Sequence, residues 1–297
     1  MKKTLMTAVL LIWAVVTTSC ASVSEDLGQE KYENPEYAEY IGRVQDYLRK
    51  GDFQGSVLVS LGSEIIYADG FGYADEKTGA PATALDTYEL GSISKQMTAA
   101  AILRLEEKGL LSTEDTLDRF FPEYSLGSRI TLDNLLRMKS GLYDYISDYY
   151  IVFGDFAEEY YRRADSDNDE EPDFPRDFLL EYLFDTPLRD EPGTEFYYCN
   201  TNYYLLGLII EQVSGMSYQE YLQKNIFEPC GMTTANNDFR GTTARGYYKD
   251  GSTLSMRTST ALGCGSVNGS VFDVFKWYEG LLSGKVISAE SLEKMTS

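Results

Sequence analysis

The chain has 297 residues, 47 acidic and 26 basic side chains, a formal net charge of −21 and no histidine. Its length can bury a large core, and an acidic excess of this size repels phosphate backbones, so we expect no nucleic-acid partner. Without histidine the chain cannot form a Ser-His-Asp or Cys-His catalytic arrangement, or a metal site built on imidazole. We expect no metal and no cofactor.

Residues 1–20 have the order of a secretory signal. Two lysines precede an apolar run from Leu5 to Val16, and small polar residues then lead to Cys20. The run is shorter than a comfortable membrane span. Cys20-Ala21-Ser22 resembles the acylated cysteine of a bacterial lipoprotein, although the residues before it depart from the usual pattern. We therefore predict export to the periplasm or cell envelope, with membrane contact only through a lipid on Cys20. The alternative is a cleaved signal in which Cys20 is incidental.

After the signal, the sequence predicts a polar tether over 21–33 and one domain over 34–297. Residues 34–90 are expected to be associated with a sheet, and residues 91–297 to be mainly helical. The spacing of apolar residues predicts a helix over Pro35–Lys50.

Two strand-like runs, Gly55–Leu61 and Glu64–Tyr73, are joined by Gly62-Ser63 and predict a β-hairpin. Two strands do not make a stable sheet by themselves, so the sheet looks incomplete. Beyond Gly91 the apolar spacing becomes helical. It predicts a buried helix from Ser92 to near Gly109 and further helices at about 130–138, 175–186, 202–214, 217–226, after Ser270 and over 288–297. The helix after Ser270 is expected to present one apolar face made of Val271, Val274, Phe275 and Tyr278.

Two further groups of residues are expected to have no special chemistry. In the irregular, acidic stretch 142–175, alternating aspartates from Asp165 to Asp169 resemble the start of a calcium loop. The sixth position lacks glycine and Arg176 replaces the closing glutamate, so we predict a solvated loop. The three cysteines after Cys20 have no paired spacing and predict buried free thiols: Cys199, Cys230 and Cys264.

The best candidate for nucleophilic chemistry is Ser92-Ile93-Ser94-Lys95, which follows Gly91. A serine hydroxyl needs a base, and in a chain without histidine that base must be lysine or tyrosine. On a helix, Lys95 lies one turn beyond Ser92 on the same face. The Ser92 N–H, at the positive end of the helix, is free to bind an oxyanion. The alternative is a helix cap with a solvated lysine. A second match, Ser291 to Lys294, lies in a charged terminal helix and is predicted to be surface.

The run from Gly91 to Ala100 resembles the nucleophile helix of the serine β-lactamase and penicillin-binding protein family. It looks closest to the branch of class C β-lactamases, D-alanyl-D-alanine carboxypeptidases and esterases. Three later stretches resemble the same branch in the right order: Thr131–Leu142, Pro187–Gly207 and Gly215–Met232. The resemblance covers about 55–297. It implies a β-lactamase-like α/β (α+β) fold, an antiparallel sheet flanked by helices plus an all-helical region.

Tyr198-Cys199-Asn200 resembles the Tyr-x-Asn motif of this family. The resemblance implies that Ser92 is the acylated nucleophile, that Lys95 and Tyr198 share proton transfer, and that Asn200 positions substrate. These roles suit the chemistry, because a phenolate beside an ammonium can act as a base and an amide offers both a donor and an acceptor.

The chain departs from the family at the third motif, Lys-Thr-Gly or His-x-Gly, which lies on a strand near the family's C-terminus. Lys77-Thr78-Gly79 matches the letters, but it precedes the nucleophile and is interpreted as a turn. The sequence ends at Ser297, before the strands that would complete the sheet, carry this motif and supply a second oxyanion N–H. We therefore expect a chain truncated at its C-terminus relative to the family, with those strands missing.

Together these features predict an exported serine hydrolase that forms an acyl-serine intermediate. Its substrates would be small molecules or peptidoglycan peptides: D-Ala-D-Ala-type peptides, β-lactams or small esters. The alternative is a truncated, non-catalytic β-lactamase-like lipoprotein with a binding or structural role. A third interpretation is an acidic surface protein that contacts partners through the tyrosine-rich loop 142–161.

Overall fold

The computed structural model describes residues 30–159, 176–238, 241–248, 250–254 and 260–297. The predicted signal with Cys20, most of the tether and the aspartates from Asp165 to Asp169 lie outside these residues. The tether prediction is wrong at its end, because Tyr32–Glu33 forms strand β1 and pairs with a longer strand. No helix in the described ranges is long and apolar enough to cross a membrane.

The predicted hairpin is present and forms the centre of a three-stranded antiparallel sheet. Strands β2 (Gly55–Leu61) and β3 (Glu64–Phe71) pair with each other, and β1 adds to β3, giving the order β1-β3-β2. The second strand ends two residues before the predicted Tyr73, because Gly72 takes a left-handed conformation with φ +69°. Within the described chain, no strand pairs with the outer edge of β2.

The remaining strands are short and lie outside this sheet. They form three antiparallel pairs: β4 (Tyr73–Asp75) with β5 (Ala80–Pro81), β6 (Tyr88–Glu89) with β9 (Asn268–Gly269), and β7 (Gly246–Tyr247) with β8 (Thr253–Leu254). Lys77-Thr78-Gly79 lies in the turn between β4 and β5. There Asp75 Oδ1 accepts the Lys77 and Thr78 N–H groups at 2.8 and 3.1 Å, which confirms the interpretation of this segment as a turn.

Each predicted helix in the described residues is present. The helices are α1 (Ala38–Lys50), α2 (Ser94–Glu107), α3 (Leu132–Leu136), α4 (Tyr149–Phe153), α6 (Arg176–Asp185), α7 (Asn200–Ser214), α8 (Tyr218–Leu222), α9 (Glu228–Cys230), α10 (Val271–Leu282) and α11 (Ala289–Thr296). A π-helical turn over Gln223–Phe227 continues α8. Helix α4 was not predicted and interrupts the stretch that we expected to be irregular.

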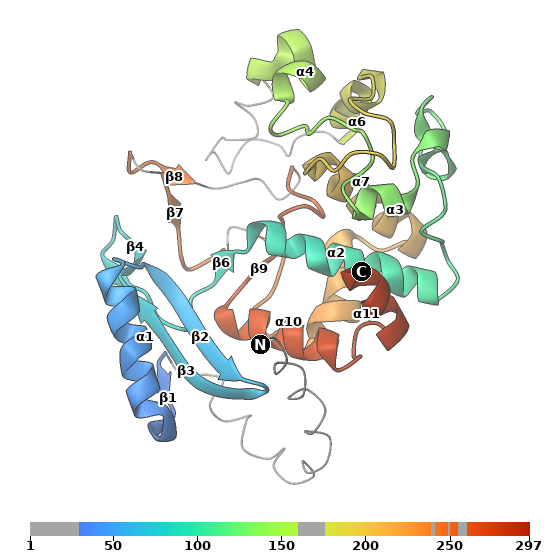
Figure 1. The fold of residues 1–297 in the computed structure, drawn as a ribbon. Helices are drawn as coiled ribbons and strands as arrows, with labels where there is room; N and C mark the ends of the chain where they lie inside the picture. Colours follow the sequence, from blue (N-terminus) through green and yellow to red (C-terminus); the bar gives the residue numbers. More distant parts are fainter. Residues whose placement is uncertain (1–29, 160–175, 239–240, 249, 255–259) are drawn as a thin grey trace, which may run out of the picture.

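The sheet lies between two helices, with α1 on one face and α10 on the other (Figure 1). Successive residues of a strand point to opposite faces. Ile66 of β3 therefore packs with Ile41 of α1, whereas Ile65 packs with Phe272 and Phe275 of α10. The sheet thus has a buried apolar surface on both sides.

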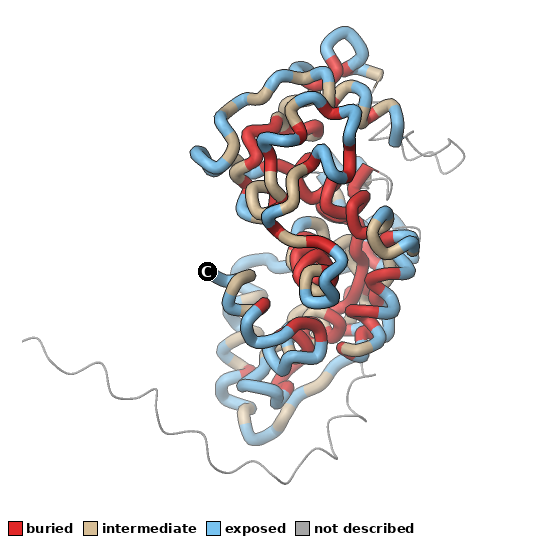
Figure 2. The backbone as a smooth tube through the Cα atoms, turned by 90° about the vertical axis from the view of Figure 1, so that its right-hand side faces the viewer, coloured by how far each residue is buried: buried red, intermediate tan, exposed pale blue. Residues whose placement is uncertain are grey.

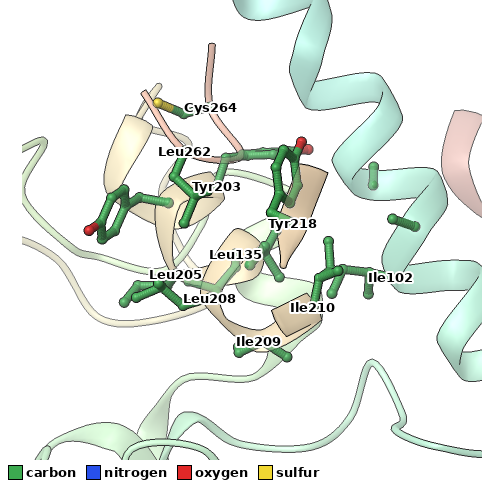
Figure 3. Packing of buried hydrophobic residues seen from close by; sticks show 14 of the residues in the cluster. Ile102, Leu135, Tyr203, Leu205, Leu208, Ile209, Ile210, Tyr218, Leu262 and Cys264 are labelled. Carbon is green, nitrogen blue, oxygen red and sulfur yellow. The ribbon is translucent and has the colours of Figure 1, made fainter. Parts of the chain in front are cut away.

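A second, larger core fills the helical region. Figure 2 shows the buried residues gathered in the interior of the molecule. Buried side chains of α2, α7 and the loop after residue 260 belong to one apolar cluster. Helix α7 contributes apolar side chains toward α2, including Ile210 near Ile102 (Figure 3). Gly207 of α7 lies against Gly263, where an added Cβ would meet the Gly263 Cα at 3.3 Å. This close approach places the 261–267 segment directly beside α2 and α7.

The predicted apolar face of α10 is only partly right. Phe275 is buried as expected, but the most buried side chain is Trp277, and Tyr278 is 43% exposed. The helix is covered on two sides, because Phe275 packs on the sheet while Trp277 donates its ring N–H to Gln96 Oε1 of α2 at 3.1 Å. A sequence prediction of one apolar face therefore misses the second buried side of α10. Val274 and Tyr278 instead line an open groove.

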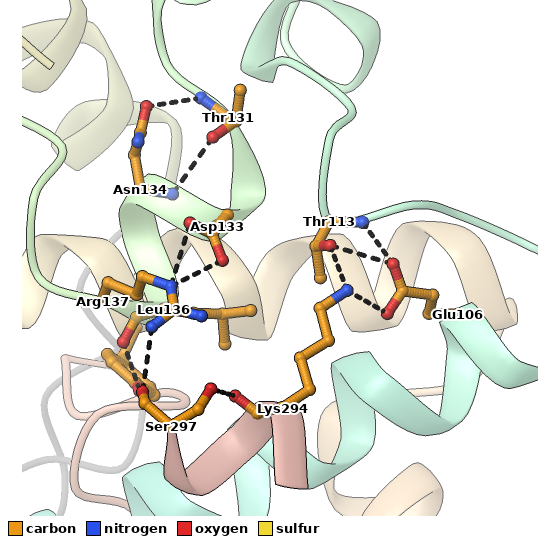
Figure 4. A network of polar contacts seen from close by, with 10 residues as sticks. Glu106, Thr113, Thr131, Asp133, Asn134, Leu136, Arg137, Lys294 and Ser297 are labelled. Carbon is orange, nitrogen blue, oxygen red and sulfur yellow. Dashed lines mark hydrogen bonds and ion pairs between the residues drawn. The ribbon is translucent and has the colours of Figure 1, made fainter. Parts of the chain in front are cut away.

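The prediction that the second Ser-x-x-Lys match is surface is wrong for Ser291, although the Lys294 side chain is 38% exposed. The Ser291 side chain is buried and donates to Glu107 Oε1 of α2 at 2.6 Å. Lys294 Nζ donates to Glu106 Oε2 at 2.8 Å and to Thr113 Oγ1 at 2.6 Å (Figure 4). Acidic side chains in the last turn of α2 supply these partners, so the pair fastens α11 to α2.

The three cysteines are buried and unbridged, as predicted. Burial raises the pKa of the Cys199 thiol to about 12 and that of Cys230 to about 11. Because the thiolate is the nucleophilic form of cysteine, these thiols are unreactive at neutral pH.

Candidate active site

The approach to Ser92 is fixed by a short strand pair. Strand β6 pairs with β9, and the Leu90 N–H then donates to the Val267 carbonyl at 2.9 Å. Gly91 follows with φ +52°, a conformation that favours glycine, and the chain turns into the helix. Ser92 lies in a 3-10 turn over Gly91–Ile93 that leads into α2, so its N–H is among those without an acceptor in the helix.

Lys95 lies one turn further along and is almost completely buried, with 6% of its surface exposed. Its Nζ atom is 3.0 Å from Ser92 Oγ, 2.8 Å from Asn200 Oδ1 and 2.6 Å from the Cys264 carbonyl oxygen. None of the ion pairs between described residues includes Lys95. Its three contacts are therefore with uncharged groups: a hydroxyl, a side-chain amide oxygen and a backbone carbonyl.

The hydrogen-bond capacities of these partners limit what Lys95 can do. The amide oxygen of Asn200 and the carbonyl of Cys264 only accept, so each requires an N–H from the amine. Beyond its bond to carbon, the Lys95 nitrogen has three tetrahedral positions, and the one that these two acceptors leave points at Ser92 Oγ. In the neutral amine this position is the lone pair, which is therefore directed at the serine hydroxyl.

Tyr198 reaches the same hydroxyl from the other side. Its Oη atom is 2.6 Å from Ser92 Oγ, and Lys95 Nζ lies 4.9 Å from the centre of its ring. The side chain is 47% exposed, so it borders solvent while its phenol contacts the buried pair. The structure therefore brings together Ser92, Lys95, Tyr198 and Asn200, which come from two helices and the segment between α6 and α7. The predicted lipidation site, Cys20, lies outside the described residues.

Sequence reasoning missed several groups that hold this arrangement. The Cys264 carbonyl is the acceptor with the shortest distance to Lys95, and the ring of Tyr203 lies 5.8 Å from Lys95 Nζ. The Ser94 hydroxyl accepts the Val267 N–H at 3.0 Å, which holds the 261–267 segment against α2. Glycines on both sides of Cys264 were the available signal, because they permit a tight backbone approach.

A groove of about 870 Å³ runs between the unpaired edge of β2 and α10 and reaches the residue after Ser92. Its lining is mainly apolar and includes Leu58, Leu90, Ile93, Val274 and Tyr278. In the part of the chain that the structure describes, no cluster of three or more His, Cys, Asp or Glu residues is suited to a metal ion.

The sequence of the chain matches one known protein family and several of its members. The beta-lactamase family model matches residues 42–297. A putative penicillin-binding protein, PbpX, from Bacillus subtilis (strain 168) is 32% identical over 261 residues, which cover 85% of this chain and 61% of PbpX. Penicillin-binding protein 4* of the same organism is 31% identical, covering 84% of this chain and 56% of that protein. The chain thus spans about 60% of the length of these relatives.

Solved structures show the same fold. The octameric penicillin-binding protein homologue from Pyrococcus abyssi superposes with a TM-score of 0.70 and 27% identity, over 88% of this chain and 60% of that one. A D-amino acid amidase from Ochrobactrum anthropi has a TM-score of 0.68 and 24% identity, over 84% of this chain and 72% of the amidase, and supports the fold alone. From the family match and this shared fold, the chain belongs to the beta-lactamase family, the serine hydrolase family that includes penicillin-binding proteins.

Proposed function

We propose that this protein is an exported serine hydrolase that works through an acyl-Ser92 intermediate. One observation carries the proposal: Ser92 Oγ lies 3.0 Å from Lys95 Nζ and 2.6 Å from Tyr198 Oη in a chain without histidine. Two groups that can exchange protons therefore contact one hydroxyl, which also lies at a helix N-terminus.

In acylation, Ser92 Oγ attacks the substrate carbonyl while its proton passes to the lone pair of Lys95. The oxyanion that forms accepts a hydrogen bond from the Ser92 N–H at the positive end of α2. When the bond to the leaving group breaks, the leaving group takes up this proton from Lys95 by way of the Tyr198 phenol, which contacts Ser92 Oγ and is half-exposed. Water then hydrolyses the acyl ester, which releases the acid and restores the Ser92 hydroxyl.

Asn200 has a positioning role in this scheme. The side-chain oxygen of Asn200 accepts one N–H of Lys95. The N–H₂ group of the same amide is therefore left to bind a substrate carbonyl. We propose an acyl substrate of the D-Ala-D-Ala peptide, β-lactam or small ester class, with peptidoglycan peptides as the natural source. The resemblance to proteins named as penicillin-binding supports this class.

Replacing Ser92 with alanine is expected to abolish covalent labelling of the purified chain by a fluorescent fluorophosphonate, because the attacking oxygen is gone. Fluorescent penicillin, applied in parallel, tests the substrate class. Ser291→Ala is the matched control, since it removes the serine of the other Ser-x-x-Lys sequence, and it should label at the unaltered rate. Labelling that survives in Ser92→Ala, or no labelling of the unaltered chain, would contradict the proposal and favour a non-catalytic binding protein.

We also propose that the protein is located in the periplasm or cell envelope and anchored by a lipid on Cys20. The order of charged, apolar and small residues before Cys20 supports this proposal. Cys20→Ser is expected to move the protein from the detergent phase to the aqueous phase in a detergent partition of expressing cells. Unchanged partitioning would show that Cys20 carries no anchor.

A further inference from the structure

The strongest unexplained feature near the site is Asp144, a carboxylate with 0% of its surface exposed. No ion pair between described residues includes it. Burying an ionised carboxylate is costly unless hydrogen bonds replace its water. Here Oδ1 accepts the N–H groups of Ile146 and Ser147 at 2.9 and 2.7 Å, and Oδ2 accepts the Asn200 N–H.

The third of these contacts reaches the candidate active site. Asn200 is the first residue of α7, and its side chain holds Lys95. Cys199, the residue before it, has no side-chain hydrogen bond that caps the helix. Asp144 thus performs the capping from a separate loop, where a negative charge is favourable because of the helix dipole.

The same loop holds the other end of the Tyr-x-Asn segment. Asp148 Oδ2 accepts the phenol of Tyr197 at 2.7 Å and the backbone N–H of Asp144 at 3.0 Å. Asp144 and Asp148 therefore fasten the residues on both sides of Tyr198 and Cys199. Tyr198 itself is half-exposed, so its position beside Ser92 depends on this fixed backbone.

The negative charge of Asp144 also acts on Cys199, the residue between Tyr198 and Asn200. The pKa of the Cys199 thiol is raised to about 12, first by burial and second by the Asp144 carboxylate. An asparagine in place of Asp144 would keep one acceptor oxygen and turn the other position into a donor. It therefore satisfies either the loop N–H groups or the Asn200 N–H, but not both.

We propose that Asp144 is a positioning residue for acylation, which holds Asn200 and Tyr198 in register with Lys95 and Ser92. This inference rests on the proposed function. A displacement of about 1 Å between reacting groups can slow a reaction by about a hundredfold. With a fluorophosphonate, the effect belongs in the rate constant for labelling rather than in the affinity for the reagent, because Asp144 is buried and the reagent has no acyl carbonyl for the Asn200 amide to bind.

The test measures fluorophosphonate labelling of the full chain at a series of reagent concentrations, which separates the maximal rate constant from the half-saturating concentration. Urea unfolding is measured on the same samples. Asp144→Asn is expected to lower the maximal rate constant by roughly 10–100-fold, with little change in the half-saturating concentration.

Asp273→Asn is the matched control. Asp273 is also buried and receives the Ser270 N–H at 2.9 Å, but at the start of α10 and without contact to Tyr198, Asn200 or Lys95. We expect it to reduce stability while its labelling rate stays within about twofold of the unaltered chain, as for a substitution away from the reacting groups.

Should Asp144→Asn fail to fold, Tyr197→Phe tests the same support, because it removes the contact to Asp148 and leaves both aspartates in place. A slower maximal rate in this variant supports the proposal. An unaltered rate in a folded Asp144→Asn or in Tyr197→Phe, or equal slowing by Asp273→Asn, overturns the positioning role alone. Absence of Ser92-dependent labelling in the unaltered chain overturns the proposed function and this inference with it.

Discussion

Replacing Lys95 with methionine is expected to slow labelling of Ser92 by at least about a thousandfold, within the range for loss of a general base. Methionine keeps an apolar stem in the buried site but removes the nitrogen shared by Ser92 Oγ, Asn200 Oδ1 and the Cys264 carbonyl. The substitution also leaves buried acceptors unpaired, at about 1–3 kcal/mol each. Labelling is therefore measured below the unfolding transition of the variant.

Lys294→Met is the control for this experiment, because it removes the lysine of the other Ser-x-x-Lys sequence and cuts the contacts of α11 to Glu106 and Thr113. It should reduce stability and leave the labelling rate unchanged. A Lys95→Met chain that labels within tenfold of the unaltered rate would show that Lys95 does not take the serine proton.

Lys95→Arg separates the role of a base from that of a charge. A guanidinium donates hydrogen bonds but does not lose its proton in proteins. If Lys95 acts as the base, the arginine variant is as slow as the methionine variant. If Lys95 acts only as a positive charge, the arginine variant retains labelling, and Tyr198 at 2.6 Å from Ser92 Oγ is the remaining base.

The sequence was sufficient to predict the parts of the site that depend on local pattern. Ser92 lies in the 3-10 turn that leads into α2, and Lys95 lies three residues later in α2, so their spacing places both on one face of this helical segment. Tyr198 and Asn200 were found by resemblance of the surrounding segments, and the structure brings both to within hydrogen-bond distance of that pair. Their catalytic roles stay predictions until the substitutions are made.

The contacts that sequence could not predict are those that depend on long-range packing. The Cys264 carbonyl belongs to the backbone, and its approach to Lys95 depends on a loop 169 residues away. Asp144 has the same residue type as the many solvated aspartates of this acidic chain, and only the fold shows that it is buried. In the same way, α10 has two covered sides because the sheet and α2 both reach it, which no single helical period can reveal.

Gly263→Ala is expected to disrupt both the fold and the site, because Gly263 precedes the carbonyl that accepts from Lys95. Its φ is +68°, and an added Cβ would overlap the carbonyl oxygen of Tyr203 and lie 3.1 Å from the Gly207 Cα. The left-handed conformation alone costs alanine about 1–2 kcal/mol, and overpacking adds about 1–3 kcal/mol. Moving this loop also shifts the Cys264 carbonyl away from Lys95 Nζ, so labelling of Ser92 should fall.

Gly215→Ala separates the two causes, because Gly215 has the same φ of +68° but no atom within 4 Å of an added Cβ. It should show the backbone strain alone, with a loss of about 1–2 kcal/mol in urea unfolding and an unchanged labelling rate. The stability that Gly263→Ala loses beyond the loss in Gly215→Ala then measures the contact of the added Cβ with α7. If the two variants lose equal stability and label equally, the close approach of the 261–267 segment does not hold the Cys264 carbonyl on Lys95. If only Gly263→Ala slows labelling, the backbone of this loop is part of the support of the active site.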